Sequence, residues 1–380
     1  MISEFNPFHD GHKYLIDEAR KNGATHIVSI MSGNFVQRGD VAIYSKWDRA
    51  KTALCKGIDL CIEIPCCKCL SSAQNYAFSG VEIAESLGCV DKLYFGSESG
   101  NVDDLKKIVE ILNSERFKTE FEKEYSKGVS FPVARQKSFE NIGKNSLAGL
   151  LLNSNDILAV EYLNALGKLN SKIIPVCVKR LGAKHDSAEK NDTFQSASYI
   201  RNQIFDGNTE PEFELHSLKI LETAIFYKLI TSSENSLKNI NDVDEGLENR
   251  IKQVAKCSDT LEELFGNIKT KRYTMSRIRR IILSILLDIR REDVYSKIPY
   301  IKVIGFNVKG EDILRKMKKT SLLPVIMRYS DIKKLNDGSV TKYYEKECIA
   351  TDIYSLASYN RNVNITEQKF NAFLFSDIDK

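Results

Sequence analysis

Ile2-Ser3-Glu4-Phe5-Asn6-Pro7-Phe8-His9-Asp10-Gly11-His12 stands at the start of this chain and decides its fold. Pro7 fixes φ and has no N–H to donate, so a strand that enters this stretch must end before it. An apolar stripe at Leu15, Ile16 and Ala19 then predicts a helix, with Asp10 or Gly11 as its N-cap and Gly23 just beyond its end. The stretch therefore predicts a strand, a turn and a helix.

The turn carries two histidines, His9 and His12, at the start of the predicted helix. Free N–H groups and the helix dipole favour an anion at this end, and imidazoles donate to phosphates. An isolated His-x-x-His is more often a turn with two exposed histidines. Here the strand before it and the helix after it favour a phosphate site. The pattern resembles the His-x-Gly-His signature of nucleotidyltransferases, which class I aminoacyl-tRNA synthetases share.

The composition is that of a globular protein with a core of its own. The chain has 380 residues, of which 42% are hydrophobic, and this length favours two domains. Its formal net charge of +4 is too small to indicate a partner. We expect no membrane association, since no apolar run approaches the roughly 18–20 residues of a membrane span and no signal-peptide pattern is present. Nine scattered cysteines fit a reducing, cytoplasmic setting.

Strands and helices alternate over residues 1–205. Short apolar runs at 26–31, 60–64, 92–95 and 173–178 predict buried strands, and helices are expected between them. This alternation predicts an α/β fold with a Rossmann-like parallel sheet. Residues 102–170 are too long for one crossover and predict a helical insertion. A boundary is expected near Asp206-Gly207-Asn208, followed by a mainly helical domain over 206–380. Few residues precede the turn, so either the first strand is short or the natural chain starts upstream.

Several loops at the predicted carboxyl edge of the sheet offer polar side chains. Arg38 and Asp40 lie in the loop after the second strand, and with Lys46 they form either a substrate pocket or an ordinary solvated surface. Gly96 follows a strand and lets a nucleotide approach the backbone. Ser196, Ser198 and Arg201 start a helix, as a second anion cradle or an ordinary serine cap.

Four cysteines, Cys61, Cys66, Cys67 and Cys69, lie close together in the sequence. A zinc site needs a second pair of ligands at a suitable spacing, and none follows. We interpret them as small apolar residues at a strand end and assign no metal site.

A basic segment marks the C-terminal half. Residues 269–291 hold eight basic side chains against Asp288 alone. An apolar stripe that includes Ile278, Ile281 and Ile285 predicts a helix, with basic residues beside it. A solvated helix face is the ordinary explanation of such a run, but this imbalance favours RNA binding. The residues concerned are Lys269, Lys271, Arg272, Tyr273, Arg277 and Arg280.

Longer motifs resemble the tRNA(Met) cytidine acetate ligase family over nearly the whole chain. They are the opening stretch, Met31-Ser32-Gly33-Asn34-Phe35-Val36-Gln37-Arg38-Gly39-Asp40, Lys46-Trp47-Asp48-Arg49, Ser154-Asn155-Asp156-Ile157-Leu158, Lys271-Arg272-Tyr273-Thr274, Arg277-Ile278-Arg279-Arg280 and Ala350-Thr351-Asp352-Ile353-Tyr354. Ser196-Ala197-Ser198-Tyr199-Ile200-Arg201 is similar to the Ser-Ser-Thr-x-Ile-Arg element of nucleotidyltransferases, with Ala197 in place of its second serine.

The resemblance implies an activity. Members of this family activate acetate with ATP to acetyl-adenylate, release pyrophosphate, and transfer the acetyl group to N4 of the wobble cytidine of elongator tRNA(Met). Mg²⁺ is expected because ATP chemistry normally uses it. Acetate and tRNA are the expected partners, and DNA is not. Two alternatives stay open: a nucleotidyltransferase that acts on a small phosphorylated substrate, and a non-catalytic tRNA-binding protein.

The resemblance also implies roles for residues. His9 and His12 hold the phosphates, and Arg38, Asp40 and Lys46 are assigned to catalysis from their loop position. The basic residues of 269–280 grip tRNA. The expected nucleotide-binding residues are Ile2, Ser3, Glu4, Phe5, Asn6, Pro7, Phe8, His9, Asp10, Gly11, His12, Lys13, Tyr14, Leu15, Gly96, Asn155, Arg180, Ser196, Ser198 and Arg201.

Overall fold

The computed structural model describes residues 1–181, 195–244, 246–360, 366–369 and 371–376. Its main sheet has the strand order β1-β2-β5-β8-β10, and β9 pairs with β8. β1, β2 and β5 are parallel, as predicted. The bounds are β1 Ile2–Ser3, β2 Val28–Ser32, β5 Leu60–Ile64, β8 Ile301–Phe306, β9 Val325–Ile326 and β10 Phe373–Leu374.

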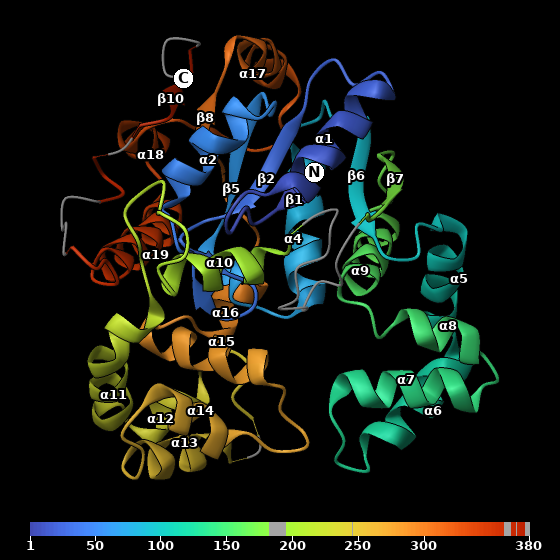
Figure 1. Cartoon of the computed structure of the whole chain (residues 1–380), viewed down its shortest axis with the longest axis vertical. Helices are drawn as coiled ribbons and strands as arrows, with labels where there is room; N and C mark the ends of the chain where they lie inside the picture. Colours follow the sequence, from blue (N-terminus) through green and yellow to red (C-terminus); the bar gives the residue numbers. More distant parts are fainter. Residues whose placement is uncertain (182–194, 245, 361–365, 370, 377–380) are drawn as a thin grey trace.

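A second parallel pair continues the α/β layer. β6 (Lys92–Ser97) pairs with β7 (Ile174–Lys179), and both lie on the β1 side of the main sheet (Figure 1). A short hairpin of β3 (Phe35–Val36) and β4 (Asp40–Val41) follows β2. The predicted strands at 60–64, 92–95 and 173–178 are therefore confirmed within one or two residues, and the expected first strand is short.

Helices cover both faces of this layer, because successive strand residues point to opposite sides. Met31 and Tyr94 pack with α1 (Asp10–Lys21) and α2 (Lys46–Cys55). Ile30 and Phe95 pack on the other face with α4 (Ala73–Ser86) and α9 (Ser154–Lys168). Since each core joins residues of β2 and β6, the two sheets are held together as one α/β unit. The predicted fold class is confirmed.

The helical insertion between β6 and β7 is also confirmed. It comprises α5 (Val102–Leu112), α6 (Glu115–Tyr125), α7 (Phe131–Asn141), α8 (Asn145–Leu150) and α9. α9 packs on α4 beneath the sheet, and α6 and α7 pack on each other at the lower right of Figure 1. The insertion therefore extends from the strands toward the helices of the C-terminal half.

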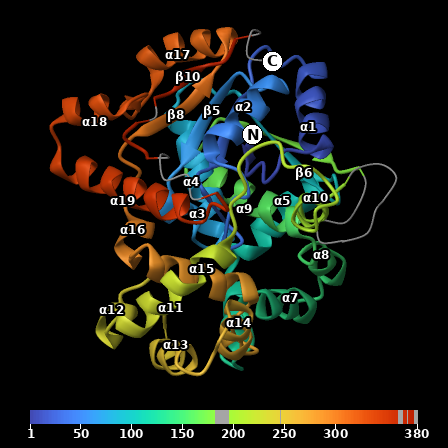
Figure 2. The same ribbon diagram turned by 60° about the vertical axis from the view of Figure 1, so that its left-hand side comes forward.

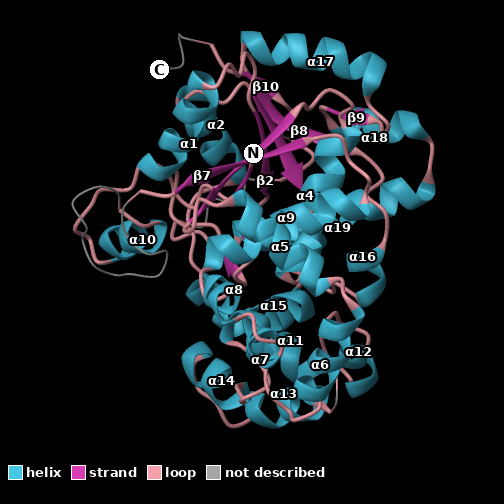
Figure 3. Cartoon of the chain, turned by 90° about the vertical axis from the view of Figure 1, so that its right-hand side faces the viewer, coloured by secondary structure: helices cyan, strands magenta, loops and turns pink. Residues whose placement is uncertain are grey.

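The C-terminal half is mainly helical, as predicted, and Figure 3 shows helices filling the end of the molecule opposite the sheet. Figure 2 shows α11 to α15 grouped there below the strands. The bounds are α10 Ala197–Phe205, η1 Leu218–Leu221, α11 Glu222–Thr231, α12 Glu234–Lys238, α13 Leu247–Ala255, α14 Leu261–Ile268, α15 Met275–Leu286, α16 Arg291–Tyr295, α17 Val308–Thr320, α18 Tyr329–Leu335 and α19 Gly338–Ser355, with α3 (Cys66–Cys69) earlier in the chain.

The sequence did not indicate that the chain returns to the sheet after residue 300. β8 pairs antiparallel with β5, so that Ile62 lies opposite Val303, and it covers an edge of the parallel sheet that would otherwise be open. The division at residues 205 and 206 stays a prediction, and β8, β9 and β10 add a link across it.

Four buried charges join this returning segment to the α/β unit. The Lys46 Nζ lies 2.6 Å from both the Glu63 Oε1 and the Glu367 Oε2. The Lys302 Nζ lies 2.9 Å from the Glu63 Oε2 and also pairs with Glu367. Burial alone would raise the pKa of Glu63, but Lys302 and Lys46 outweigh it and hold that pKa at about 2. We call these four residues the lysine–glutamate cluster.

We expect Lys46→Met to destabilise the fold by about 3–5 kcal/mol, because two buried carboxylates would then share one ammonium. Urea denaturation of the full chain measures this change. Lys51→Met, on the exposed side of the same helix, is the matched control and should change the free energy of unfolding by less than about 0.5 kcal/mol. A Lys46→Met protein of unchanged stability would contradict a structural role.

Candidate active site

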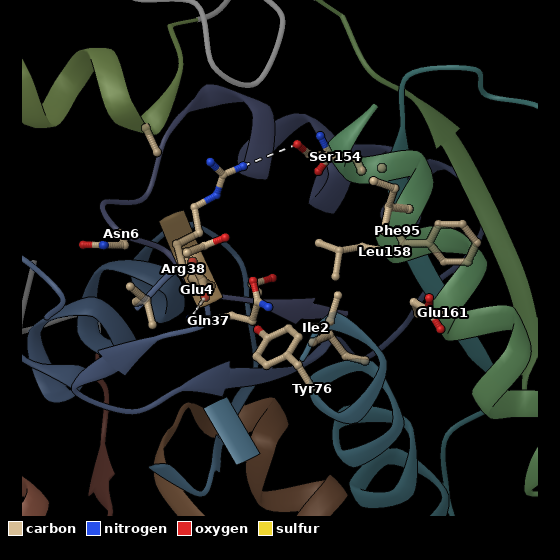
Figure 4. Close-up of a pocket in the computed structure, with 18 of the residues that line it drawn as sticks. Ile2, Glu4, Asn6, Gln37, Arg38, Tyr76, Phe95, Ser154, Leu158 and Glu161 are labelled. Atoms are coloured by element: carbon tan, nitrogen blue, oxygen red, sulfur yellow. Dashed lines mark hydrogen bonds between the residues drawn. The ribbon is translucent and has the colours of Figure 1, made fainter. Parts of the chain in front are cut away.

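A cavity of about 900 Å³ opens beyond the carboxyl ends of β1 and β6. Its lining comes from the opening stretch, the loop after β2, the helical insertion, α10 and α15. Figure 4 shows Glu4, Gln37 and Arg38 on one side, and Phe95, Leu158 and Glu161 on the other. This is the edge at which open α/β sheets bind ligands, and the volume suits a nucleotide together with a second substrate.

The two histidines shape the start of α1. His9 is the N-cap, where its Nδ1 accepts a hydrogen bond from the Gly11 N–H at 3.1 Å. The His12 Nδ1 accepts from the His9 N–H at 3.2 Å, and the two rings stack with centroids 3.8 Å apart. The prediction of Asp10 or Gly11 as N-cap was wrong, because the imidazole itself reaches the helix N–H groups. In a neutral ring whose Nδ1 accepts, Nε2 carries the hydrogen and is the donor for a ligand.

The position of the His9 ring leaves little room for a side chain at Gly11. A Cβ at residue 11 would lie 2.9 Å from the His9 Cε1, which is closer than side-chain atoms approach. Phe5, ahead of the turn, is fully buried and has a φ of 50°, an uncommon value for a residue other than glycine. Its ring packs on Phe8 and against the edge of His12. The turn is therefore fixed by the packing of the buried Phe5 ring before it and by the hydrogen bonds of His9 and His12 after it.

The predicted second anion cradle lies beside the first. Ser196 is the N-cap of α10, as expected, and accepts from the Tyr199 N–H. The Arg201 Nη1 donates to the Asn6 carbonyl at 2.6 Å, and its Nη2 donates to the Ser198 Oγ at 3.1 Å. Burial lowers the pKa of Arg201, and the nearby carboxylates of Asp40 and Glu4 oppose this shift. Asn6 and Arg201, 195 residues apart in sequence, thus meet at the same part of the cavity lining.

The loop after β2 forms the neighbouring wall. The Glu4 Oε1 accepts from the Gln37 N–H at 2.7 Å, and the Arg38 Nη2 donates to the Ser154 Oγ at 3.4 Å (Figure 4). Asp40 pairs with Arg279 at 3.3 Å. Burial raises the pKa of Asp40, while Arg279 and Arg201 act against it. Arg38 and Asp40 both line the cavity.

Lys46 lies elsewhere. Its side chain is 1% exposed and is held in the lysine–glutamate cluster, and it is absent from the lining of the cavity. The prediction that it takes part in catalysis therefore has no support in this geometry. Its loop position suggested the cavity, but the first turn of α2 points its side chain into the interior.

Next to Asn155 of the opposite wall, the Glu98 carboxylate occupies the N-terminus of α9, although Glu98 itself does not line the cavity. Glu98 accepts from the backbone N–H of Asn155 at 3.3 Å and of Asp156 at 2.9 Å, and from the Asn155 amide at 2.6 Å. Arg180 packs over Gly96, where a Cβ would lie 3.3 Å from its Cγ. Burial lowers the pKa of Arg180, and Glu98 opposes this. The sequence gave no indication of this role for Glu98, since its partners are 57 and 58 residues away.

Asp156 is a second residue whose role the sequence did not show. It is fully buried and accepts from the Ser99 N–H at 3.2 Å and the Ser99 Oγ at 3.0 Å, and from the Ser97 hydroxyl. It therefore fixes the loop that follows β6.

Some residues of the basic segment line the cavity, and others are exposed on the surface. Arg280 is 8% exposed and its Nη1 donates to the Gln37 carbonyl at 3.2 Å, and burial lowers its pKa to about 10. The Arg277 Nη2 donates to the Asp242 carbonyl at 3.1 Å. Tyr273 is buried, whereas Lys269 and Lys271 are exposed outside the cavity. RNA binding by these residues stays a prediction. Lys269 and Lys271 are the members of the group that are exposed to a partner.

Most of the predicted site residues meet at this one cavity. Those that line it are Ile2, Ser3, Glu4, Phe5, Asn6, His9, Gly11, His12, Tyr14, Leu15, Arg38, Asp40, Gly96, Asn155, Arg180, Ser196, Ser198, Arg201, Arg272, Arg277 and Arg280. Those that do not are Pro7, Phe8, Asp10, Lys13, Lys46, Lys269, Lys271 and Tyr273.

Comparisons with known proteins agree with this arrangement. The model of the HIGH nucleotidyl transferase family matches residues 1–369. The tRNA(Met) cytidine acetate ligase of Thermoanaerobacter sp. strain X514 is 40% identical, over 96% of each chain. The protein of the same name from Acetivibrio thermocellus is 35% identical, over 97% of each chain. This chain belongs to the tRNA(Met) cytidine acetate ligase family of HIGH nucleotidyltransferases.

Solved structures extend the comparison to this family's fold. The apo crystal structure of Thermotoga maritima TmcAL matches with a TM-score of 0.92 and 28% identity over 98% of each chain. The same protein bound with alpha-thio ATP matches with a TM-score of 0.89 at the same identity and coverage. The fold around the cavity is therefore shared with a protein that binds an ATP analogue.

The cavity does not offer a protein-built metal site. Of the carboxylates that line it, Glu4 accepts from the Gln37 N–H, Asp40 pairs with Arg279 and Glu161 pairs with Arg135. The described residues contain no group of three or more His, Cys, Asp or Glu side chains placed to hold a metal. We derive no step through a metal held by the protein. Cys61, Cys66, Cys67 and Cys69 are all buried.

We expect His9→Asn to keep the fold and lose most of the activity. Asparagine is a good N-cap, so the free energy of unfolding should change by less than about 1 kcal/mol. The lost imidazole donor should lower acetate-dependent pyrophosphate release by about a hundredfold to a thousandfold. Steady-state kinetics and thermal melting measure the two effects. His9→Ala removes the cap and the donor together. If pyrophosphate release fell in His9→Ala but not in His9→Asn, His9 would act through the helix cap alone.

Proposed function

We propose that this chain is an ATP-dependent acetate ligase that acetylates N4 of the wobble cytidine of elongator tRNA(Met). The observation that carries the proposal is one cavity that joins the His9–His12 turn, the α10 cradle and the arginines of α15. A nucleotide and a second, RNA-borne substrate need such a shared volume. The names of the relatives supply the identity of the reaction. A reducing cytoplasm suits a tRNA-modifying enzyme with buried thiols.

The first step is adenylation of acetate. A carboxylate oxygen of acetate attacks the α-phosphorus of ATP, the bond from that phosphorus to the bridging oxygen breaks, and pyrophosphate leaves. His9 and His12 donate to phosphate oxygens, and Arg201 and Arg38 neutralise the charge that develops. Positioning and charge neutralisation are sufficient for this chemistry, so no covalent intermediate with the protein is needed. Mg²⁺ would enter with the phosphates of ATP.

The second step is acyl transfer. N4 of cytidine attacks the acetyl carbonyl carbon, the bond to the AMP phosphate oxygen breaks, and N4 loses a proton as AMP leaves. We place acetate near Arg38 and Asp40, on the wall that faces the His9–His12 turn. Lys46 has no part in this step, given its position in the lysine–glutamate cluster.

The test measures pyrophosphate release from ATP with acetate, with and without total tRNA, followed by nucleoside analysis of the tRNA. We expect N4-acetylcytidine only when acetate, ATP and protein are all present. Turnover without modified tRNA would indicate a different acceptor, such as a small phosphorylated substrate. Absence of turnover with tight, salt-sensitive tRNA binding would indicate a non-catalytic tRNA-binding protein.

We expect the double variant Lys269→Ser/Lys271→Ser to weaken tRNA binding. Two fewer phosphate contacts should make the slope of log K against log salt less negative by roughly 1.4–1.8. Filter binding across a salt series measures the slope, and acetate-dependent ATP–pyrophosphate exchange should be unchanged. Lys318→Ser/Lys319→Ser, at the exposed end of α17, is the matched control. Equal slopes for both double variants would contradict RNA binding at 269–271.

A further inference from the structure

A buried ion pair forms part of the cavity wall on the side of the helical insertion. The Arg135 Nη1 on α7 lies 3.3 Å from the Glu161 Oε1 on α9, and both residues line the cavity. Their side chains are 4% and 9% exposed. Figure 4 shows Glu161 across the cavity from Glu4 and Arg38, where the proposed function places the phosphates and acetate. The pair therefore lies in the same volume as the adenylating residues but on another wall.

The pair has unused hydrogen-bonding capacity. Within the described part of the chain, the Arg135 Nε is buried and has no hydrogen-bond partner. Burial raises the pKa of Glu161 and lowers that of Arg135, and each charge opposes the shift of the other. An arginine offers five donors, and a buried donor left unpaired costs free energy that an acceptor on a ligand would recover. A carboxylate beside a guanidinium thus presents an acceptor next to a donor.

One aromatic ring adjoins the pair, and a second lines the same cavity. Phe131 is 47% exposed, and the Arg135 guanidinium lies 5.7 Å from its ring centroid. Tyr125 has the Arg272 guanidinium 5.1 Å above its ring, which joins the insertion to the basic segment. All four residues line the cavity. Exposed rings and guanidinium planes are the surfaces on which unpaired bases of RNA stack.

The order of acceptor and donor favours one kind of pyrimidine edge. Cytosine presents an N4–H donor next to the N3 acceptor, and this pattern fits Glu161 and Arg135 in turn. Uracil presents the reverse, an O4 acceptor next to an N3–H donor, which would set its O4 against the carboxylate. We propose that Arg135 and Glu161 form the pocket that recognises the acceptor cytosine and presents its N4 to acetyl-adenylate. This assignment rests on the proposed function, which supplies cytidine as the acceptor.

In this arrangement the Arg135–Glu161 pair binds the acceptor base and takes no part in adenylation. Glu161 accepts one of the two N4 hydrogens, and the faces of N4 stay open to the cavity in which acetyl-adenylate forms. Arg135 donates to N3, and Phe131 or Tyr125 supplies the stacking surface. Loss of the pair should therefore impair acetyl transfer and base selection while adenylation continues. The adenine of ATP has the same donor–acceptor order as cytosine, so it is the competing occupant that the test must distinguish.

The decisive experiment compares two reactions of the full chain. Acetate-dependent ATP–pyrophosphate exchange without tRNA reports adenylation, and N4-acetylcytidine formation on elongator tRNA(Met) reports transfer. For Glu161→Gln we expect unchanged exchange, with the KM for ATP unaltered, and transfer reduced by about tenfold to a hundredfold. Glu140→Gln, the same change on the exposed side of α7, is the matched control and should leave both reactions intact.

A binding competition distinguishes base recognition by the pair from a merely structural role. A structural role would not change the preference for cytidine over uridine. tRNA(Met) transcripts with cytidine or uridine at the wobble position compete for the wild-type chain in the presence of a non-hydrolysable ATP analogue. We expect the wild type to prefer cytidine and Glu161→Gln to lose that preference. Arg135→Lys, which keeps the charge but not the planar fork, should show the same loss and serves if Glu161→Gln fails to fold.

Three results would overturn the proposal. The first is transfer by Glu161→Gln at the wild-type rate, and the second is a raised KM for ATP in exchange, which would assign the pair to adenine. The third is equal wild-type binding of the cytidine and uridine transcripts. A wild-type chain that shows no exchange at all would instead refute the proposed function, and the competition would still report whether the pair selects cytosine.

Discussion

The buried guanidinium of Arg49 is the contact on which the rest of the site depends. Its side chain is 1% exposed, and it donates to three backbone carbonyls: those of Glu4 and Gly33, and that of Tyr44 at 3.1 Å. These carbonyls follow β1, follow β2 and precede α2. Burial lowers the pKa of Arg49 because a charged group is poorly solvated there, and the three carbonyl dipoles replace water. One side chain therefore sets the relative position of the loops that carry His9, Arg38 and Asp40.

A second constraint joins the α/β unit to α15. Gly39 has a φ of 79°, and a Cβ there would lie 2.6 Å from the Arg280 backbone nitrogen. The chain can approach the helix this closely only as glycine. Arg279 and Arg280 then bind Asp40 and the Gln37 carbonyl on either side of that contact. Arg272, Arg277, Arg279 and Arg280 of the basic segment are thereby part of the cavity wall.

The returning C-terminal segment supports the same loops from behind. β8 pairs with β5, and Glu367 reaches Lys46 and accepts from the Thr351 hydroxyl at 2.6 Å. The lysine–glutamate cluster thus joins α2, β5 and β8 to the segment after α19, and the Thr351 contact of Glu367 adds α19 itself. Its charges stay buried because each carboxylate meets two ammonium groups, and this mutual neutralisation offsets the cost of desolvation. α2 carries both Lys46 and Arg49, so the contacts of Lys46 in this cluster also anchor the helix that bears Arg49.

Local patterns determined much of this protein from the sequence by itself. Proline after the first strand, the serine cap at 196, and apolar runs such as 60–64 act within a few residues of chain. The turn with its two histidines, the strands at 26–31, 60–64, 92–95 and 173–178, the helical insertion and the family could therefore all be predicted. The tertiary structure alone decided which side chains are buried and what they meet. Lys46 was expected at the site and lies in the core, and Arg280 was expected on the surface and contacts Gln37. Glu98, Asp156 and the Arg135–Glu161 pair gave no local signal, because the partners named above lie 26 to 59 residues away. A periodicity identifies a helix or strand and its apolar face, but a buried charge is placed by partners that only the folded chain brings within reach.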